Sequence, residues 1–200
     1  MKKAVESDKD AKWKVVMFHH DIYGSGAPHS DTDGANLRIL FAPLMDEFDV
    51  DICLTGHDHS YARTFQLYDG TAIDYGNSVA VNPEGTMYIA AGSASGSKFY
   101  NLATQKQYYI AERSNTQLPT FSTLDVTDEG LTIRTYDYNG NKYADDFTLY
   151  KTENQATAKA LIDQAAATAE TGYTSETYAT MKNALTVMQT LMAATKPDEA

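Results

Sequence analysis

Apolar residues along the chain form short runs and periodic stretches that predict its first elements. Two mostly apolar runs, residues 13–18 and 50–55, have the length of buried strands. Between them, apolar residues at helical spacing predict a helix over residues 35–48, after a loop rich in Gly, Ser, Pro and Asp. Residues 1–11 read as the end of an amphipathic helix, and the order strand, loop, helix, strand predicts a βαβ-like unit.

The rest of the chain divides into a β-like part and a helical tail. Four stretches separated by turn sequences predict strands, the last two as a hairpin: residues 86–96, 121–126, 131–138 and 143–151. From Glu153 the composition shifts to Ala, Thr and Gln, with two helical patterns broken at Gly172. Thr174 or Ser175 can cap the second helix. We therefore expect a body over residues 1–151 and a helical hairpin over residues 152–200.

Charge and composition exclude several classes of protein. The formal net charge of −11 argues against a protein that follows the phosphates of a nucleic acid. The single cysteine, Cys53, excludes an internal disulfide framework and a cysteine zinc cluster, and we expect a buried, inert thiol. No apolar run approaches the ~20 residues needed to cross a bilayer, and residues 1–10 lack the apolar core of a signal peptide.

Four of the five histidines directly follow the two predicted strands. His19 and His20 follow the first strand, and His57 and His59 follow the second in the sequence Gly-His-Asp-His. Alternate side chains of an extended segment point the same way, so His57 and His59 can face one point near His19. Neutral imidazole binds zinc, iron and other borderline metals, which predicts a metal site here. The alternative is that His19, His20 and the loop residue His29 are ordinary polar or solvent-exposed residues.

These segments resemble the calcineurin-like metallophosphoesterases, especially their purple acid phosphatase branch. The segment WKVVMFHHDIY is similar to the family's Trp, apolar strand, His and Tyr pattern, and GHDHSYAR is similar to its Gly-His-x-His segment. GTMYIAAGSASG and PTFSTLDVTDEGLTIRTYDYNG resemble its closing strands. The resemblance implies an α/β (α+β) fold, a metallophosphoesterase-like β-sandwich half with flanking helices, followed here by the C-terminal helical hairpin. It also implies a metal-dependent phosphoric ester hydrolase with a phosphate ester substrate.

The resemblance further implies two metal ions, Fe, Zn or Mn, in the intact enzyme. His19 and His57 would bind one ion and His59 the other. The family's remaining ligands lie in the patterns Gly-Asp-x-Gly, Gly-Asp-x-x-Tyr and Gly-Asn-His-Asp/Glu, which do not occur in this sequence. We therefore expect this chain to bind at most one ion and to show little or no phosphatase activity. On the same grounds we expect Met1 to be an internal methionine of a longer protein.

Three residues are implied to act on the substrate. His29 would contact the phosphate or protonate the leaving group. His20 would be a second phosphate contact, or would protonate the leaving group in place of His29. Arg63 would face the phosphate, with a surface ion pair as an equal alternative. A zinc site of the three predicted ligand histidines, for hydration or hydrolysis, is a further alternative that needs no upstream half.

The helical tail resembles the FIVAR module of secreted enzymes of Gram-positive bacteria, with an ordinary amphipathic hairpin as the alternative. The resemblance implies that residues 152–200 form an incomplete FIVAR-like module. It also implies that the parent protein is extracellular or at the cell surface, where the tail would meet surface or carbohydrate partners. A non-catalytic cell-surface interaction module, with the β body as platform, is the second candidate function.

Overall fold

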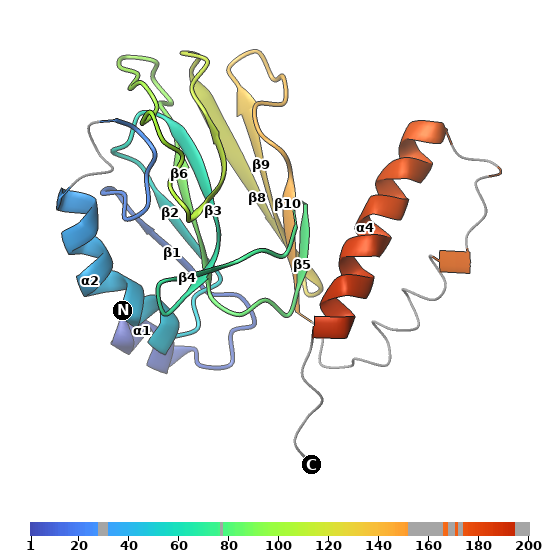
Figure 1. Cartoon of the computed structure of the whole chain (residues 1–200). Coiled ribbons are helices and arrows are strands. Elements are labelled where there is room, and N and C mark those ends of the chain that lie inside the picture. The colour runs from blue at the N-terminus through green and yellow to red at the C-terminus, as the bar shows by residue number, and fades with distance from the viewer. Residues whose placement is uncertain (28–31, 77, 152–165, 168–170, 172–173, 195–200) are drawn as a thin grey trace.

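The computed structural model describes residues 1–27, 32–76, 78–151, 166–167, 171 and 174–194 (Figure 1). Its helices are α1 (Lys2–Ser7), α2 (Thr32–Glu47) and α4 (Ser175–Ala194). Its strands are β1 (Val15–Phe18), β2 (Ile52–Thr55), β3 (Tyr61–Tyr68), β4 (Thr71–Ile73), β5 (Val79–Val81), β6 (Thr86–Ala91), β7 (Ile110–Ser114), β8 (Thr120–Val126), β9 (Gly130–Asp137) and β10 (Phe147–Tyr150).

The first sheet brings together the ends of the two strands that the histidines follow. Its order is β1-β2-β6-β3-β4, and β7 also pairs with β3. β1, β2 and β6 are parallel to one another, whereas β3 runs antiparallel to β6, β4 and β7. Because Phe18 pairs with Thr55, β1 and β2 end at the same level. His19 and Gly56 therefore follow side by side at one edge of the sheet.

The second sheet covers one face of the first and α2 covers the other (Figure 1). Its order is β5-β10-β9-β8, with β5 parallel to β10 and the other pairs antiparallel. Ile52 and Met87 of the first sheet share a core with Ile133 and Leu149 of the second. On the opposite face, Met45 of α2 packs in a second core with residues such as Cys53 and Tyr88. Burial raises the pKa of the Cys53 thiol to about 12, in agreement with an inert thiol.

The architecture is thus mixed α/β with two mixed sheets, and the described part of the chain contains few helices. The predicted strands at residues 13–18, 50–55 and 121–126 are present within a residue or two, and β9 and β10 form the predicted hairpin. The strand predicted over residues 86–96 is too long, because β6 ends at Ala91. The hydrophobic pattern does not predict β3, β4, β5 or β7. In β3 both faces are buried and the buried residues include Thr64 and Gln66, which hides its periodicity.

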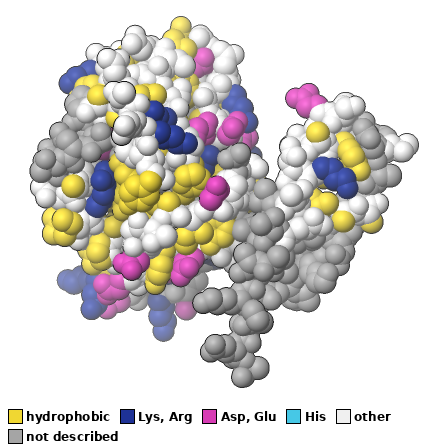
Figure 2. All heavy atoms as spheres, in the orientation of Figure 1, with side chains coloured by type: hydrophobic (Ala, Val, Ile, Leu, Met, Phe, Trp, Pro, Cys, Tyr) yellow, Lys and Arg dark blue, Asp and Glu magenta, His cyan; other side chains and the backbone are white. Residues whose placement is uncertain are grey.

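Hydrophobic side chains also reach the surface of the body, where they lie between charged groups (Figure 2). The most exposed are Met17 on the edge strand β1, Ile39 on α2 and Tyr108 just before β7. No helix in the described ranges is long and apolar enough to cross a membrane.

The end of β10 is joined to the start of β2 by a buried ion pair. The Nζ atom of Lys151 lies 2.6 Å from Oδ1 of Asp51, whose side chain is 5% exposed. The Lys14 N–H donates to the other oxygen of Asp51, and the Lys151 ammonium also lies over the Trp13 ring. Burial raises the pKa of Asp51 above its ordinary value, although the hydrogen bonds from Lys151 and Lys14 oppose the shift.

The helix α4 lies beside the edge strand β5 (Figure 1). The predicted cap is present: Thr174 Oγ1 accepts a hydrogen bond of 3.2 Å from the Thr177 N–H. The first helix of the predicted hairpin lies outside the described residues, except for residues 166–167, which are helical. The domain division at residue 152 and the FIVAR-like tail stay predictions.

We expect Thr174→Ala to loosen the start of α4, because the helix loses its side-chain acceptor for an otherwise unpaired N–H. The cost of such a loss is about 1 kcal/mol, which is roughly a fivefold rise in amide exchange over the first turn. Hydrogen exchange at residues 177–180 measures it. Thr180→Ala is the matched control, since Thr180 only bonds back to the Glu176 carbonyl within the helix. Equal exchange in the two variants would show that the Thr174 side chain does not stabilise the start of α4.

Candidate metal centre

Four histidines lie at the carboxyl ends of the parallel strands β1 and β2. The two strand ends are joined by a 3.0 Å hydrogen bond from the Gly56 N–H to the His19 carbonyl oxygen. His19 and His20 are exposed, and His57 and His59 are partly exposed. In open α/β sheets, binding sites form at such strand ends, so the predicted location is structurally suitable.

His19 and His57 face each other through ring nitrogens. Nε2 of His19 and Nδ1 of His57 are 3.3 Å apart, and the ring centroids are 5.2 Å apart. Two nitrogens bound to one tetrahedral zinc at about 2.0–2.1 Å each would lie about 3.3 Å from one another. The pair therefore has the spacing of two ligands of a single ion. His57 holds this position with a backbone φ of 63°, which is uncommon for a residue with a side chain.

His20 stands beside this pair. Its ring centroid lies 4.6 Å from that of His57 and 5.3 Å from that of His19. The structure thus brings His19, His20 and His57 together, with His20 on the exposed side.

His59 has different neighbours. Its Nδ1 lies 2.9 Å from the Lys98 carbonyl oxygen, and its ring packs 4.9 Å from the Tyr100 ring. Because a carbonyl oxygen only accepts, Nδ1–H of His59 donates this hydrogen bond, which leaves Nε2 as the atom with a lone pair for a metal. No three His, Cys, Asp or Glu side chains converge on one point among the residues that the structure describes, which exclude His29. The donor set thus fits one ion at the His19–His57 pair, with His59 oriented separately.

Beneath the histidines, a buried carboxylate holds a glycine-rich loop. Oδ2 of Asp58, which is 0% exposed, accepts hydrogen bonds of 2.8 Å from the N–H groups of Ser25 and Gly26. Its Oδ1 accepts a bond of 2.9 Å from the Ser60 hydroxyl. The alternation of side chains along an extended segment indicates only that Asp58 points away from His57 and His59. Its link to the loop has no local signal, because Ser25 and Gly26 lie more than thirty residues away in the chain.

A second carboxyl, Asp21, lies close to Asp58. It is 4% exposed, and its Oδ2 has no hydrogen-bond partner within the described residues. Burial, and then the neighbouring Asp58 carboxylate, raise the pKa of Asp21 to about 7. The two acidic side chains thus form a buried cluster below the histidines rather than part of their exposed surface.

The two remaining predicted site residues are placed differently. His29 lies outside the described residues, so its predicted role stays a prediction. The Arg63 side chain is 3% exposed, its Nη2 lies 3.4 Å from Glu112 and its guanidinium lies 4.5 Å from the centre of the Phe147 ring. Arg63 therefore forms an ion pair, but in a buried position rather than at the surface, and this placement gives a phosphate contact of Arg63 no support.

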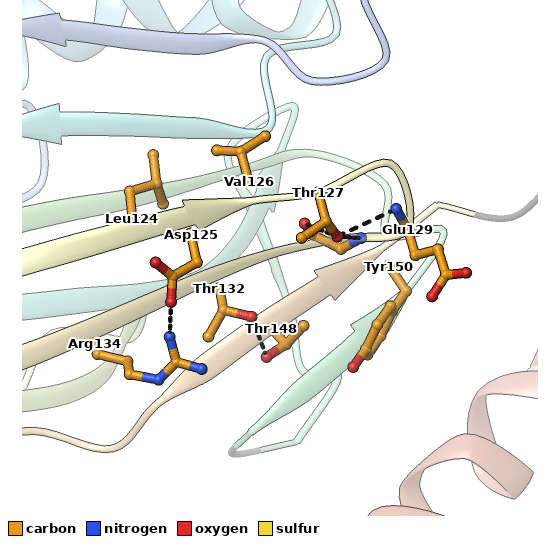
Figure 3. A pocket seen from close by; sticks show the side chains of 10 residues that line it. Leu124, Asp125, Val126, Thr127, Glu129, Thr132, Arg134, Thr148 and Tyr150 are labelled. Atoms are coloured by element: carbon orange, nitrogen blue, oxygen red, sulfur yellow. Dashed lines mark hydrogen bonds and ion pairs between the residues drawn. The ribbon is translucent and has the colours of Figure 1, made fainter.

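A hollow on the second sheet does not coincide with the histidines (Figure 3). It is lined by Leu124, Asp125, Val126, Thr127, Glu129, Gly130, Thr132, Arg134, Thr148 and Tyr150. Its polar groups pair with each other: Asp125 with Arg134, and Thr132 with Thr148. The histidine cluster is the better candidate site, because ring nitrogens of His19 and His57 face each other at 3.3 Å, whereas the polar groups of the hollow pair with one another.

Comparison with known proteins agrees with this choice. Residues 2–61, which contain the four clustered histidines, match the family model of the calcineurin-like phosphoesterases. The chain is also 26% identical over 137 residues to purple acid phosphatase 4 of Arabidopsis thaliana, which covers 67% of this chain and 34% of the relative. The chain is related to the calcineurin-like phosphoesterases and has purple acid phosphatase homologues.

Two further proteins resemble other shares of this chain. An uncharacterized protein of Mycobacterium tuberculosis is 28% identical over 101 residues, 46% of this chain and 18% of the relative. The fold resembles that of a purple acid phosphatase from yellow lupin (Lupinus luteus) seeds, with a TM-score of 0.59 at 19% identity, over 76% of this chain and 28% of that chain. The chain thus spans about a third or less of the length of these relatives. The calcineurin-like phosphoesterase family uses a binuclear metal centre.

Proposed function

We propose that this chain carries the histidine side of the active site of a metal-dependent phosphoric ester hydrolase of the acid phosphatase type. The observation that carries the proposal is the 3.3 Å separation of His19 Nε2 and His57 Nδ1. Two neutral imidazoles brought to the spacing of metal ligands, at the ends of parallel strands, favour a metal site over a pair of ordinary surface residues.

Each histidine has a separate task in this proposal. His19 and His57 hold one ion through the facing nitrogens, and His59 offers Nε2 to a second ion while Lys98 fixes its Nδ1. When bound, the metal ions supply a nucleophile from water near neutral pH and neutralise the phosphate oxygens. His20, exposed beside the pair, donates a hydrogen bond to the phosphate, and His29 gives a proton to the departing alkoxide. The imidazoles suit Fe and Zn, and Mn is included because the family resemblance implies it.

The chain by itself supplies only these histidines. We propose that the intact centre holds two ions and that this chain binds at most one, with little phosphatase activity. The finer assignments of the tail, a FIVAR-like module at residues 152–200 in an extracellular or cell-surface protein, rest on the sequence resemblance alone and are proposed on that basis.

Metal content tests the proposed site. After loading with zinc, manganese or iron and desalting, we expect about one tightly held ion per chain, by elemental analysis. His57→Ala removes half of the facing pair. We therefore expect the dissociation constant for zinc, measured by titration, to rise at least 100-fold. His20→Ala is the matched control, since it removes a neighbouring imidazole and keeps the facing nitrogens; it should bind zinc as the unchanged chain does.

The results separate the candidate functions. A folded chain that retains no metal under any of these conditions would contradict the proposed site and favour the non-catalytic interaction module. Equal weakening by His57→Ala and His20→Ala would show that the imidazoles bind metal without the proposed geometry. Turnover of a phosphomonoester within tenfold of a complete relative would contradict the expected low activity.

A further inference from the structure

Asp58 lies between His57 and His59 in the sequence, but its side chain is fully buried while theirs are partly exposed. We infer that Asp58 is a positioning residue, which holds His57 against His19 by fastening the end of β2 to the loop at Gly24–Gly26. The consequence for metal binding rests on the proposed function, whereas the positioning of the imidazole does not.

The hydrogen bonds of Asp58 reach two separate segments. One carboxylate oxygen accepts from the backbone N–H groups of Ser25 and Gly26, each at 2.8 Å. The other accepts from the Ser60 N–H at 3.2 Å and from its hydroxyl at 2.9 Å. Four hydrogen bonds to one buried carboxylate make a rigid connection, because hydrogen bonds to a charged acceptor are shorter and stronger than neutral ones. The loop after β1 and the turn after β2 are therefore held as one unit.

His57 needs such a support. The Asp58 N–H donates to the Gly56 carbonyl oxygen at 2.7 Å, which closes a three-residue turn around His57. With a central φ of 63°, this turn is of the rare and strained kind. Strained backbone of this kind persists only where the surroundings over-determine it. The Asp58 side chain supplies that constraint directly after the strained residue.

The strained turn aims Nδ1 of His57 at His19. If the carboxylate loses its bonds, His57 can relax to an ordinary backbone conformation and its ring turns away from His19. The 3.3 Å contact between the two imidazoles would then be lost, while both sheets keep their cores. This local effect distinguishes a positioning residue from one that only stabilises the fold.

The test compares Asp58→Asn with the unchanged chain, first without metal. In the unchanged chain at pH 8, nitrogen-15 NMR of labelled histidine should show a hydrogen-bonded imidazole proton shared by His19 and His57. Asp58→Asn keeps the shape but cannot accept all four bonds, so we expect this proton to exchange at least tenfold faster. Zinc affinity should fall 10- to 100-fold, as is usual when the support of a ligand is removed.

Two further variants complete the design. Leu131→Ala opens a cavity in the core between the two sheets, where Leu131 pairs with Leu149 of β10. It therefore destabilises the chain without changing a residue at the histidines. It should keep both the imidazole proton and the zinc affinity. Ser60→Ala removes one donor to Asp58 and should give about a threefold effect in the same direction; it carries the test if Asp58→Asn does not fold.

The outcomes are distinct. The inference is overturned if a folded Asp58→Asn chain, or Ser60→Ala in its place, gives the same imidazole signal as the original chain. It is also overturned if the original chain shows no such signal. An equal loss of the signal in Leu131→Ala also overturns it, since the effect would then be one of general stability. If the unchanged chain shows the signal but binds no zinc, the proposed function fails, and the imidazole signal of the variants still decides the role of Asp58.

Discussion

Gly26→Ala is expected to lower the free energy of unfolding by about 3 to 5 kcal/mol, because the new methyl group would displace a buried carboxylate from its hydrogen bonds. A Cβ at residue 26 would lie 2.2 Å from Oδ1 of Asp58, a side chain that is 0% exposed. Gly26 cannot easily move aside, because its own N–H bonds Asp58 and it forms a β-bridge with Leu102. Denaturation in urea measures the loss.

Gly56→Ala is the matched control for this change. Gly56 also lies beside the histidines, but a Cβ there would meet nothing closer than 3.5 Å, at Nδ1 of His19. We expect an effect below about 1 kcal/mol, since a substitution without strain also restricts the unfolded chain. If Gly26→Ala costs no more than Gly56→Ala, the packing of the loop against Asp58 is not as the structure shows.

Lys151→Met is expected to cost about 3 kcal/mol at pH 8, because it leaves the buried Asp51 carboxylate without its cation. Lys151 Nζ is 2.6 Å from Asp51, and the same ammonium donates to the Lys12 carbonyl oxygen at 3.0 Å. Methionine keeps much of the side-chain volume over Trp13, so the main loss is electrostatic. Thermal or urea unfolding at several pH values measures it.

The cost of Lys151→Met should fall as the pH falls. Burial raises the pKa of Asp51 in the folded chain, and loss of Lys151, which opposes this shift, raises it further. The folded variant then keeps a proton that the unfolded chain releases near its ordinary pKa of about 4. Its stability therefore increases as the pH falls from the folded pKa toward that value.

The double variant Asp51→Asn, Lys151→Met is the control, and it should be more stable at pH 8 than Lys151→Met alone, because no charge is left buried. A loss from Lys151→Met that is equal at pH 5 and pH 8 would mean that the ion pair does not carry the effect.

The sequence predicts correctly those elements whose buried positions are mostly filled by apolar residues. β1 and β2 are short apolar runs in a parallel part of the sheet, and α2 has one apolar stripe that faces the first sheet. β3 could not be recognised in this way, because Thr64 and Gln66 are buried in it beside apolar residues. Burial of those polar groups depends on partners from other strands; the Thr64 hydroxyl, for example, accepts from the Tyr88 N–H.

The sequence also predicts one part of the candidate site and not another. Strand order and the Gly-His-Asp-His sequence suffice to place His57 near His19, because parallel strands end at one edge of a sheet. The sequence does not reveal that Arg63 is buried against Phe147 and Glu112, since each partner comes from a distant strand.

By itself the sequence determined the chemistry available to this protein: imidazoles after two apolar strands, a family resemblance, a single cysteine and a formal net charge of −11. The tertiary structure alone decided how those imidazoles are held. The Lys98 carbonyl that orients His59 and the loop N–H groups that fix Asp58 are backbone groups, which any residue type provides. Such contacts leave no mark in the order of side chains, because they depend on how distant segments meet in the folded chain.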